Sequence, residues 1–305
     1  MDPNWTSLCP PMQTYFLNIP RDVSYDYYLL VVTSLSIFLS LIATLSNSIV
    51  VFTLLKTPSL RTPSNFLIVG LAVSDFSTGV VVLPSFISYK VSEHARDVHV
   101  FCPTGMLYVA TGTALSMISF LTLSTITADR FLAVQLHLRY KQYVTTKRYA
   151  FLLFLYWGFC IFIVVCRFRF FNSYTLMTGI VLLSLFLAMD AFFILKVSKV
   201  VHRHSVQIQA QHQQSTEQPL DMARFKKTVN VMYYIIGAFV LCYMPLLAAL
   251  VVLFINSDFS LEIRGWFTIA ELFLLSNAAV NPVIYCFRIK EIRDAFKKLL
   301  PKRRH

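Results

Sequence analysis

Seven long apolar segments constrain this chain more than any other feature of its sequence. Each segment is long enough to cross about 30 Å of hydrocarbon as a helix that rises 1.5 Å per residue. Polar links join the segments, and the longest link, 202–222, carries six Gln and is predicted to be a mobile loop. The predicted spans are 27–55, 64–89, 101–134, 148–165, 174–201, 223–255 and 263–287.

Composition supports a bilayer as the solvent of these segments. Of 305 residues, 56% are hydrophobic and only 14% are charged, whereas soluble domains carry about 25% charge. A soluble globule of this size would still expose about a quarter of its unfolded surface, so it could not hide so many apolar residues. We therefore predict an all-α membrane protein: an extracellular tail at 1–26, a seven-transmembrane helix bundle at 27–287, and a cytoplasmic tail at 288–305.

The segment that follows the seventh span has the pattern of a short amphipathic eighth helix. Ile289, Ile292, Phe296 and Leu299 recur at steps of three and four residues, with basic residues between them. This period predicts a helix that lies on the inner membrane surface.

Basic residues predict the orientation of the bundle. With the N-terminus outside, 21 of the 27 Lys and Arg residues face the inner side. A multi-pass plasma membrane protein with a cytoplasmic C-terminus is therefore expected. The net charge of +12 then reflects loops that face an anionic leaflet, and it calls for no nucleic acid partner.

An adjacent acid and base, Asp129 and Arg130, close the third span. Charge at the edge of hydrocarbon is costly, so an intramembrane or interfacial pair is a candidate functional site. From these residues alone, a switch at the inner face and a simple helix anchor are equally acceptable.

Polar side chains inside the spans form a second candidate site. A lone carboxylate at mid-membrane needs partners, and no Lys or Arg lies at comparable depth. Oxygen-rich neighbours suit a hard cation such as Na⁺, or a proton. The alternative is a hydrogen-bonded network that only joins helices. The residues are Asn47, Asp75, Ser119, Asn277 and Asn281.

Glu271 is the third candidate. It lies eleven residues before Pro282, about 16 Å along the helix. Its carboxylate should face the bundle, where it could meet a cationic group of a ligand or the ammonium of Lys90. Both interpretations remain open at this stage.

The ordered motifs resemble the rhodopsin-like (class A) family of G-protein-coupled receptors, from residue 47 to residue 296. The matching residues are Ser46-Asn47 and Val50, Leu71-Ala72-Val73-Ser74-Asp75, Asp129-Arg130-Phe131, Trp157, Phe239, Cys242-Tyr243-Met244-Pro245 and Asn281-Pro282-Val283-Ile284-Tyr285.

The resemblance implies specific roles for these residues. Asp75, Ser119, Asn277 and Asn281 would line a sodium pocket, the one candidate for a bound cofactor. Arg130 would pair with Asp129 at rest and contact a heterotrimeric G protein after the sixth helix swings outward. The switch residues would be Asp129, Arg130, Phe131, Phe239, Tyr243, Pro245, Asn281, Pro282 and Tyr285.

Departures from the family pattern bear on the ligand. Tyr243 replaces the usual Trp of the sixth helix, and Gly112 stands where amine receptors carry an Asp. Leu275 occupies the place of the retinal-binding Lys, so neither retinal nor a biogenic amine is expected. The ligand-pocket candidates are Glu271, Gly112 and Tyr243. The fifth span has no Pro, and its Asp190 has no assignable partner.

Covalent features can also be predicted. Cys9, Cys102 and Cys166 fall near outer helix ends, where a disulfide can form. The family's usual bond to the second outer loop would join Cys102 to Cys166, although Cys102 is spaced differently from Arg130. Asn4 begins a glycosylation triplet.

Catalytic motifs are lacking from the sequence, so an enzyme is not expected. The expected function is that of a class A receptor with an unidentified extracellular ligand. The alternative, a transporter of a small solute or ion, would require related halves and broken helices.

Overall fold

The computed structural model describes residues 23–136, 139–169, 220–256 and 260–288, with short stretches at 180–199 and at 293–294. In 220–236 and 285–288 it describes the backbone alone. All regular elements in these residues are helical. Most of the predicted eighth helix and of the fifth span lies outside the described part, as do Asp190, Asn4 and the side chain of Tyr285.

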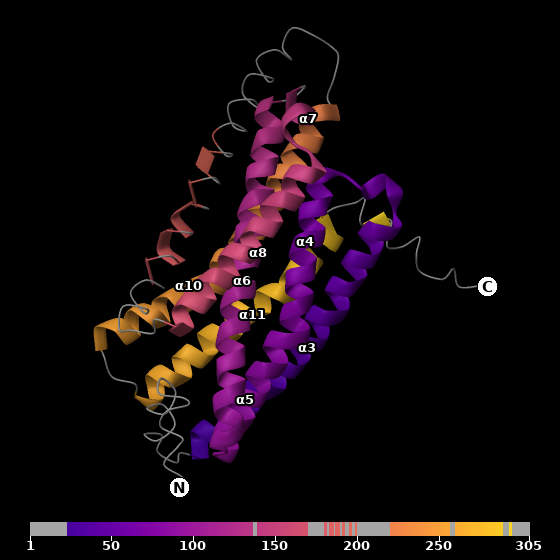
Figure 1. The fold of residues 1–305 in the computed structure, drawn as a ribbon. Coiled ribbons are helices and arrows are strands. Elements are labelled where there is room, and N and C mark those ends of the chain that lie inside the picture. Colours follow the sequence, from indigo (N-terminus) through magenta and orange to yellow (C-terminus); the bar gives the residue numbers. More distant parts are fainter. Residues whose placement is uncertain are drawn as a thin grey trace, which may run out of the picture.

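The helices form an elongated bundle and lie lengthwise along one another (Figure 1). Six of them are long and apolar enough to cross a membrane. Their bounds differ from the predicted spans by a few residues, chiefly because several helices extend past the apolar core into polar turns. The elements are α3 (Val23–Lys56), η1 (Pro58–Leu60), α4 (Pro63–Ser77), η2 (Thr78–Val82), α5 (Leu83–Ala95), α6 (Val98–Leu136), α7 (Tyr140–Tyr143), α8 (Thr146–Arg169), α10 (Leu220–Asn256) and α11 (Leu261–Arg288).

Local sequence explains where the second span begins. Thr62 caps α4: its hydroxyl accepts from the Asn65 backbone N–H at 3.2 Å, and Pro63 stands at the first helical position. The span then passes through η2, a π-helical turn directly before Pro84. Proline lacks a backbone N–H and clashes with the preceding turn, and a wider turn relieves that conflict.

The turn between α5 and α6 is short. Arg96 adopts a left-handed conformation with φ 57°, which ends α5. The Asp97 carboxylate then accepts from the backbone N–H groups of His99 (2.9 Å) and Val100 (3.4 Å), which start α6. Two residues therefore reverse the chain between two membrane spans.

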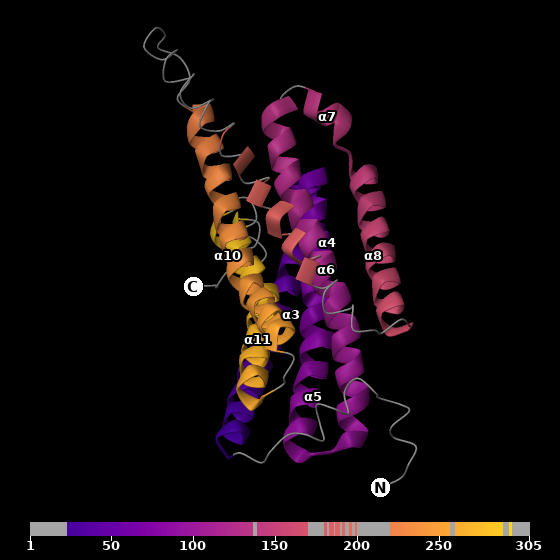
Figure 2. The same ribbon diagram turned by 90° about the vertical axis from the view of Figure 1, so that its left-hand side faces the viewer.

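Helix α6 packs against α4, α5 and η2, while α8 packs along α6 and α4. Helix α10 packs mainly along α11, and Figure 2 shows this pair side by side. Helix α3 lies against α4, α5 and α11.

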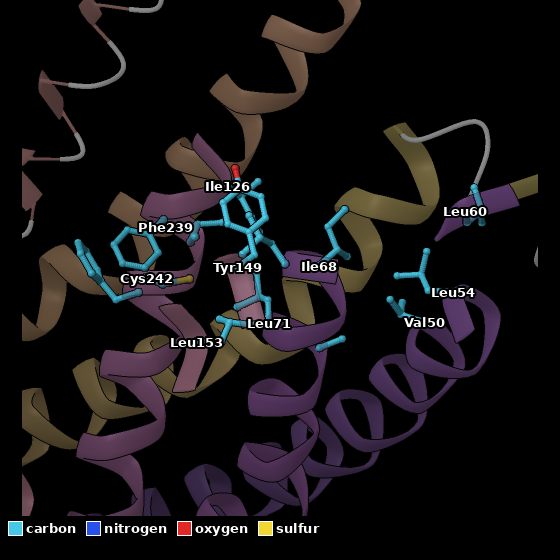
Figure 3. Close-up of a cluster of buried hydrophobic side chains, with 14 of the residues drawn as sticks. Val50, Leu54, Leu60, Ile68, Leu71, Ile126, Tyr149, Leu153, Phe239 and Cys242 are labelled. Atoms are coloured by element: carbon cyan, nitrogen blue, oxygen red, sulfur yellow. The ribbon is translucent and has the colours of Figure 1, made fainter. Parts of the chain in front are cut away.

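A buried apolar cluster fills the space between these helices near the α7 end (Figure 3). Leu71 and Ile68 of α4, Leu153 of α8 and Phe239 of α10 meet there. By contrast, large apolar side chains such as Phe154 and Phe162 point outward, as expected of surfaces that face lipid.

Candidate functional site

Three polar clusters lie at successive heights in the bundle. The first is at the α7 end and centres on Asp129, whose side chain is 1% exposed. Tyr140 and Tyr149 donate to Asp129 Oδ1 at 2.5 Å and 2.6 Å, and Ser64 donates to Oδ2 at 2.7 Å. Arg130 Nε lies 3.7 Å from Oδ2, a loose ion pair. Three hydroxyl donors therefore satisfy the oxygens of this buried carboxylate.

These donors come from three different elements: Ser64 from α4, Tyr140 from α7 and Tyr149 from α8. Burial and its bond to Asp129 raise the pKa of Tyr140 to about 12, so its hydroxyl remains a protonated donor at neutral pH. Through these hydrogen bonds, the cluster holds the connection between α6 and α8 against the end of the bundle. Arg130 itself is only partly buried, so its guanidinium can leave the pair at little cost.

The second cluster lies at mid-height around Asp75, which is 1% exposed. Ser119 donates to Asp75 Oδ1 at 2.9 Å and Asn281 Nδ2 donates to Oδ2 at 2.8 Å. Ser74 and Ser119 share a further bond of 2.9 Å. The cluster thus brings together residues of α4, α6 and α11, as predicted from their sequence positions.

Two amide oxygens near this level have no hydrogen-bond partner among the described residues: Asn47 Oδ1 and Asn277 Oδ1. Asn47 uses its amide nitrogen to join α3 to α11, donating to the carbonyl of Ala278 at 2.9 Å. A buried carboxylate, a hydroxyl and an unpaired amide oxygen are ligands that suit a hard cation such as Na⁺. No group of three His, Cys, Asp or Glu side chains able to hold a metal occurs in the described part of the chain.

An aromatic cluster lies beside the Pro245 turn. The rings of Phe239 and Tyr243 stack at 4.0 Å, and Phe120 of α6 meets Phe239 edge-on at 4.9 Å. The Tyr243 hydroxyl donates to the Ser116 carbonyl at 3.2 Å. Tyr243 therefore keeps the packing role of the expected Trp and adds one direct bond between α10 and α6.

The third cluster lies at the end of the bundle opposite α7 and contains two acids and two bases. Arg264 Nη2 is 2.9 Å from Glu93 Oε1, and the Tyr25 hydroxyl donates to the same oxygen at 2.8 Å. Lys90 Nζ lies 3.5 Å from Glu93 Oε2 and 3.8 Å from Glu271 Oε2. All four charged residues are more than nine-tenths buried.

The Lys90–Glu271 pair that the sequence offered as one interpretation of Glu271 is thus present. Gly112 is also buried, and a Cβ there would meet Val82 at 3.3 Å. The position therefore packs tightly against η2.

The sequence left the Cys102–Cys166 disulfide open, and the structure does not form it. Cys166 is a free thiol, although Cys102 is itself disulfide-bonded. Two cysteines near the same side of a membrane need not approach within the 4.4–6.8 Å that a disulfide requires between Cα atoms.

The sequence matches a family model described as "7 transmembrane receptor (rhodopsin family)" over residues 46–176 and 163–285. This match spans most of the chain and contains the charged residues of all three clusters. The chain belongs to this family.

Curated relatives of the receptor agree with this assignment. Adenosine receptor A2b of Gallus gallus is 21% identical over 88% of this chain and 87% of its own length. Cannabinoid receptor 1 of Xenopus laevis is 25% identical over 89% of this chain and 63% of its own length. 5-Hydroxytryptamine receptor 1B of Vulpes vulpes is 25% identical over 86% of this chain and 84% of its own length. The family model describes a seven-transmembrane receptor, and all three relatives are named as receptors rather than enzymes, so the predictions of fold, family and a non-enzymatic protein are confirmed.

Sequence reasoning missed several residues of the receptor's clusters. Glu93 was missed although it stands three residues after Lys90, a spacing that places two side chains on one helical face. The sequence also gave no partner for Arg264, which is 5% exposed and pairs with Glu93. For Ser64 and Tyr149 no local signal existed, because their partner Asp129 lies on a different helix.

Proposed function

We propose that this receptor binds an extracellular ligand and activates a heterotrimeric G protein by outward movement of α10. The observation that carries the proposal is the Asp129 cluster. Three hydroxyls satisfy the carboxylate without help from Arg130, so Arg130 is free to change partners. Arg130 Nε lies 3.7 Å from Asp129 Oδ2 near the end of α6, a loose contact that suits a side chain that turns toward a cytoplasmic partner.

Movement of α10 is supported by its packing. Helix α10 lies mainly along α11, and an aromatic stack with one hydroxyl bond joins it to α6 at the Pro245 level. The side-chain contacts described between α10 and α6 therefore lie at the Pro245 level, about which the α7-end half of α10 would swing. A ligand that binds the open form about 1.4 kcal/mol more tightly shifts the ratio of the two forms about tenfold.

The Lys and Arg distribution supports an outward-facing N-terminus, so the Asp129 cluster would face the cytoplasm and the Lys90 cluster the outside. The three relatives are named for adenosine, cannabinoids and 5-hydroxytryptamine, which are chemically unlike one another. Gly112 argues against an amine ligand, and Leu275 argues against retinal.

The test is a panel of G-protein activation sensors in cells that express the receptor, first without ligand and then with peptide, nucleoside and lipid libraries. We expect a sensor response that Arg130→Ala abolishes at equal surface expression. Arg148→Ala is the matched control, because Arg148 is an exposed arginine at the same end that bonds only backbone carbonyls. Normal signalling by Arg130→Ala would refute the proposed switch. Solute flux without any sensor response would indicate a transporter.

We also propose that Asp75 binds sodium together with Ser119, Asn277 and Asn281. Sodium chloride should raise the melting temperature of the purified receptor relative to choline chloride of equal ionic strength. Asp75→Asn should remove that difference, because its carboxylate is the one formal charge of the cluster. A sodium effect of unchanged size in the variant would exclude Asp75 as a ligand.

A further inference from the structure

The ammonium of Lys90 lies in a cage of groups from α5 and α11. Its Nζ is 3.0 Å from Thr268 Oγ1, 3.5 Å from Glu93 Oε2 and 3.8 Å from Glu271 Oε2. The rings of Tyr89 and Phe86 lie 4.9 Å and 5.5 Å from Nζ at their centroids. Lys90 is 3% exposed, so water does not solvate this charge.

Carboxylates, a hydroxyl and aromatic faces are the groups with which proteins recognise a bound ammonium ion. We propose that the bundle contains an ammonium site whose natural occupant is the chain's own Lys90. On this view, the Lys90→Ala substitution vacates a built site that accepts small primary alkylammonium ions.

The balance of charge between the two buried carboxylates and their cations explains why the identity of the cation in the site affects ligand binding. Glu93 has a second cation, because Arg264 contacts it at 2.9 Å, whereas the cation that contacts Glu271 is Lys90. A ligand that brought its own ammonium to Glu271 would leave Lys90 to share Glu93 with Arg264. Three buried cations would then share two carboxylates, which is unfavourable.

Lys90 is therefore a specificity-determining residue that disfavours cationic ligands. This consequence for ligand choice rests on the proposed receptor function, but the ammonium site itself does not. The search for a ligand should accordingly begin with neutral and zwitterionic compounds.

The test is thermal unfolding of the purified full-length protein with n-propylammonium, which restores the atoms that Lys90→Ala removes. We expect Lys90→Ala to melt below the unsubstituted protein because two buried carboxylates then share one cation. The probe should raise its melting temperature in a dose-dependent manner, by about 3 °C or more. It should leave the unsubstituted protein unchanged.

Three controls separate this effect from general solvent effects. 1-Propanol has the same chain without the charge and should not stabilise Lys90→Ala. Lys90→Met removes the charge but keeps the side-chain volume, so n-propylammonium should have no room to bind. Adding Glu271→Gln to Lys90→Ala should raise the required probe concentration at least tenfold.

The proposal is overturned if Lys90→Ala does not respond to the probe, or if 1-propanol or Lys90→Met gives the same shift. If Lys90→Ala does not reach the cell surface, its surface level in cells grown with n-propylammonium replaces the melting temperature. An increase that Lys90→Met does not share supports the site, and no increase refutes it. Neither readout uses G-protein activation, so failure here is distinguishable from failure of the proposed function.

Discussion

Gly79 marks a close approach of two helices in this bundle, and replacing it with Ala gives a quantitative test of the packing. A Cβ at Gly79 would lie 2.5 Å from Thr44 Oγ1, 2.8 Å from Thr44 N and 3.2 Å from Thr44 Cα. The Gly79 carbonyl also accepts from Ser40 at 2.8 Å, which holds η2 against α3. Two of the three close atoms belong to the backbone, so no rotamer change can remove the clash.

The expected loss of stability follows from two opposing effects. Overpacking costs about 1–3 kcal/mol, whereas Ala in place of Gly within a helix contributes about 0.5–1 kcal/mol. With the middle of each range, the net loss of about 1 kcal/mol should lower the melting temperature by about 2–4 °C. Adding Thr44→Ala should restore only part of this loss, because it removes the Oγ1 contact but neither backbone contact.

Thermal unfolding of the purified receptor, followed by intrinsic fluorescence, measures these shifts. Two other glycines supply matched controls. Gly70→Ala would meet only the mobile end of Leu153, at 2.6 Å, and should cost less than Gly79→Ala. Gly158→Ala meets no atom within 4 Å and should be neutral or slightly stabilising. Equal melting temperatures for all three variants would refute the close approach of η2 and α3.

Three further substitutions test the clusters. Tyr149→Phe removes one hydroxyl donor from buried Asp129 and should destabilise the receptor by about 1.5–3 kcal/mol; an unchanged melting temperature would contradict that bond. Tyr243→Phe keeps the stacked ring and loses a single 3.2 Å bond to a carbonyl, so it should cost about 1 kcal/mol or less, and Tyr243→Ala clearly more. The pKa of Tyr140 rises from its usual 10 to about 12 on folding, so its hydroxyl contributes stability that is present below pH 10 and lost between pH 10 and 12. The difference in melting temperature between the unsubstituted receptor and Tyr140→Phe should therefore be constant from about pH 6 to 9, and a change within that range would contradict the raised value.

The sequence by itself determined the fold class and the family. A chain in lipid must satisfy every backbone N–H and C=O within its own helices, so a long apolar run specifies a spanning helix directly. The ordered motifs, from Asn47 to Tyr285, then identified the family without any contact information. The Asp75 cluster was also predictable, because its residues stand within those motifs.

The tertiary structure alone decided which side chains meet across helices. An apolar surface that faces lipid on one side and protein on the other leaves the rotation of each helix undetermined by composition. Thus Tyr149 could be assigned to Asp129, and Arg264 to Glu93, only when the helices were in place. The sequence left the pairing of Cys102 with Cys166 open for the same reason: a disulfide depends on the distance between two backbones, and sequence spacing on separate helices does not fix that distance.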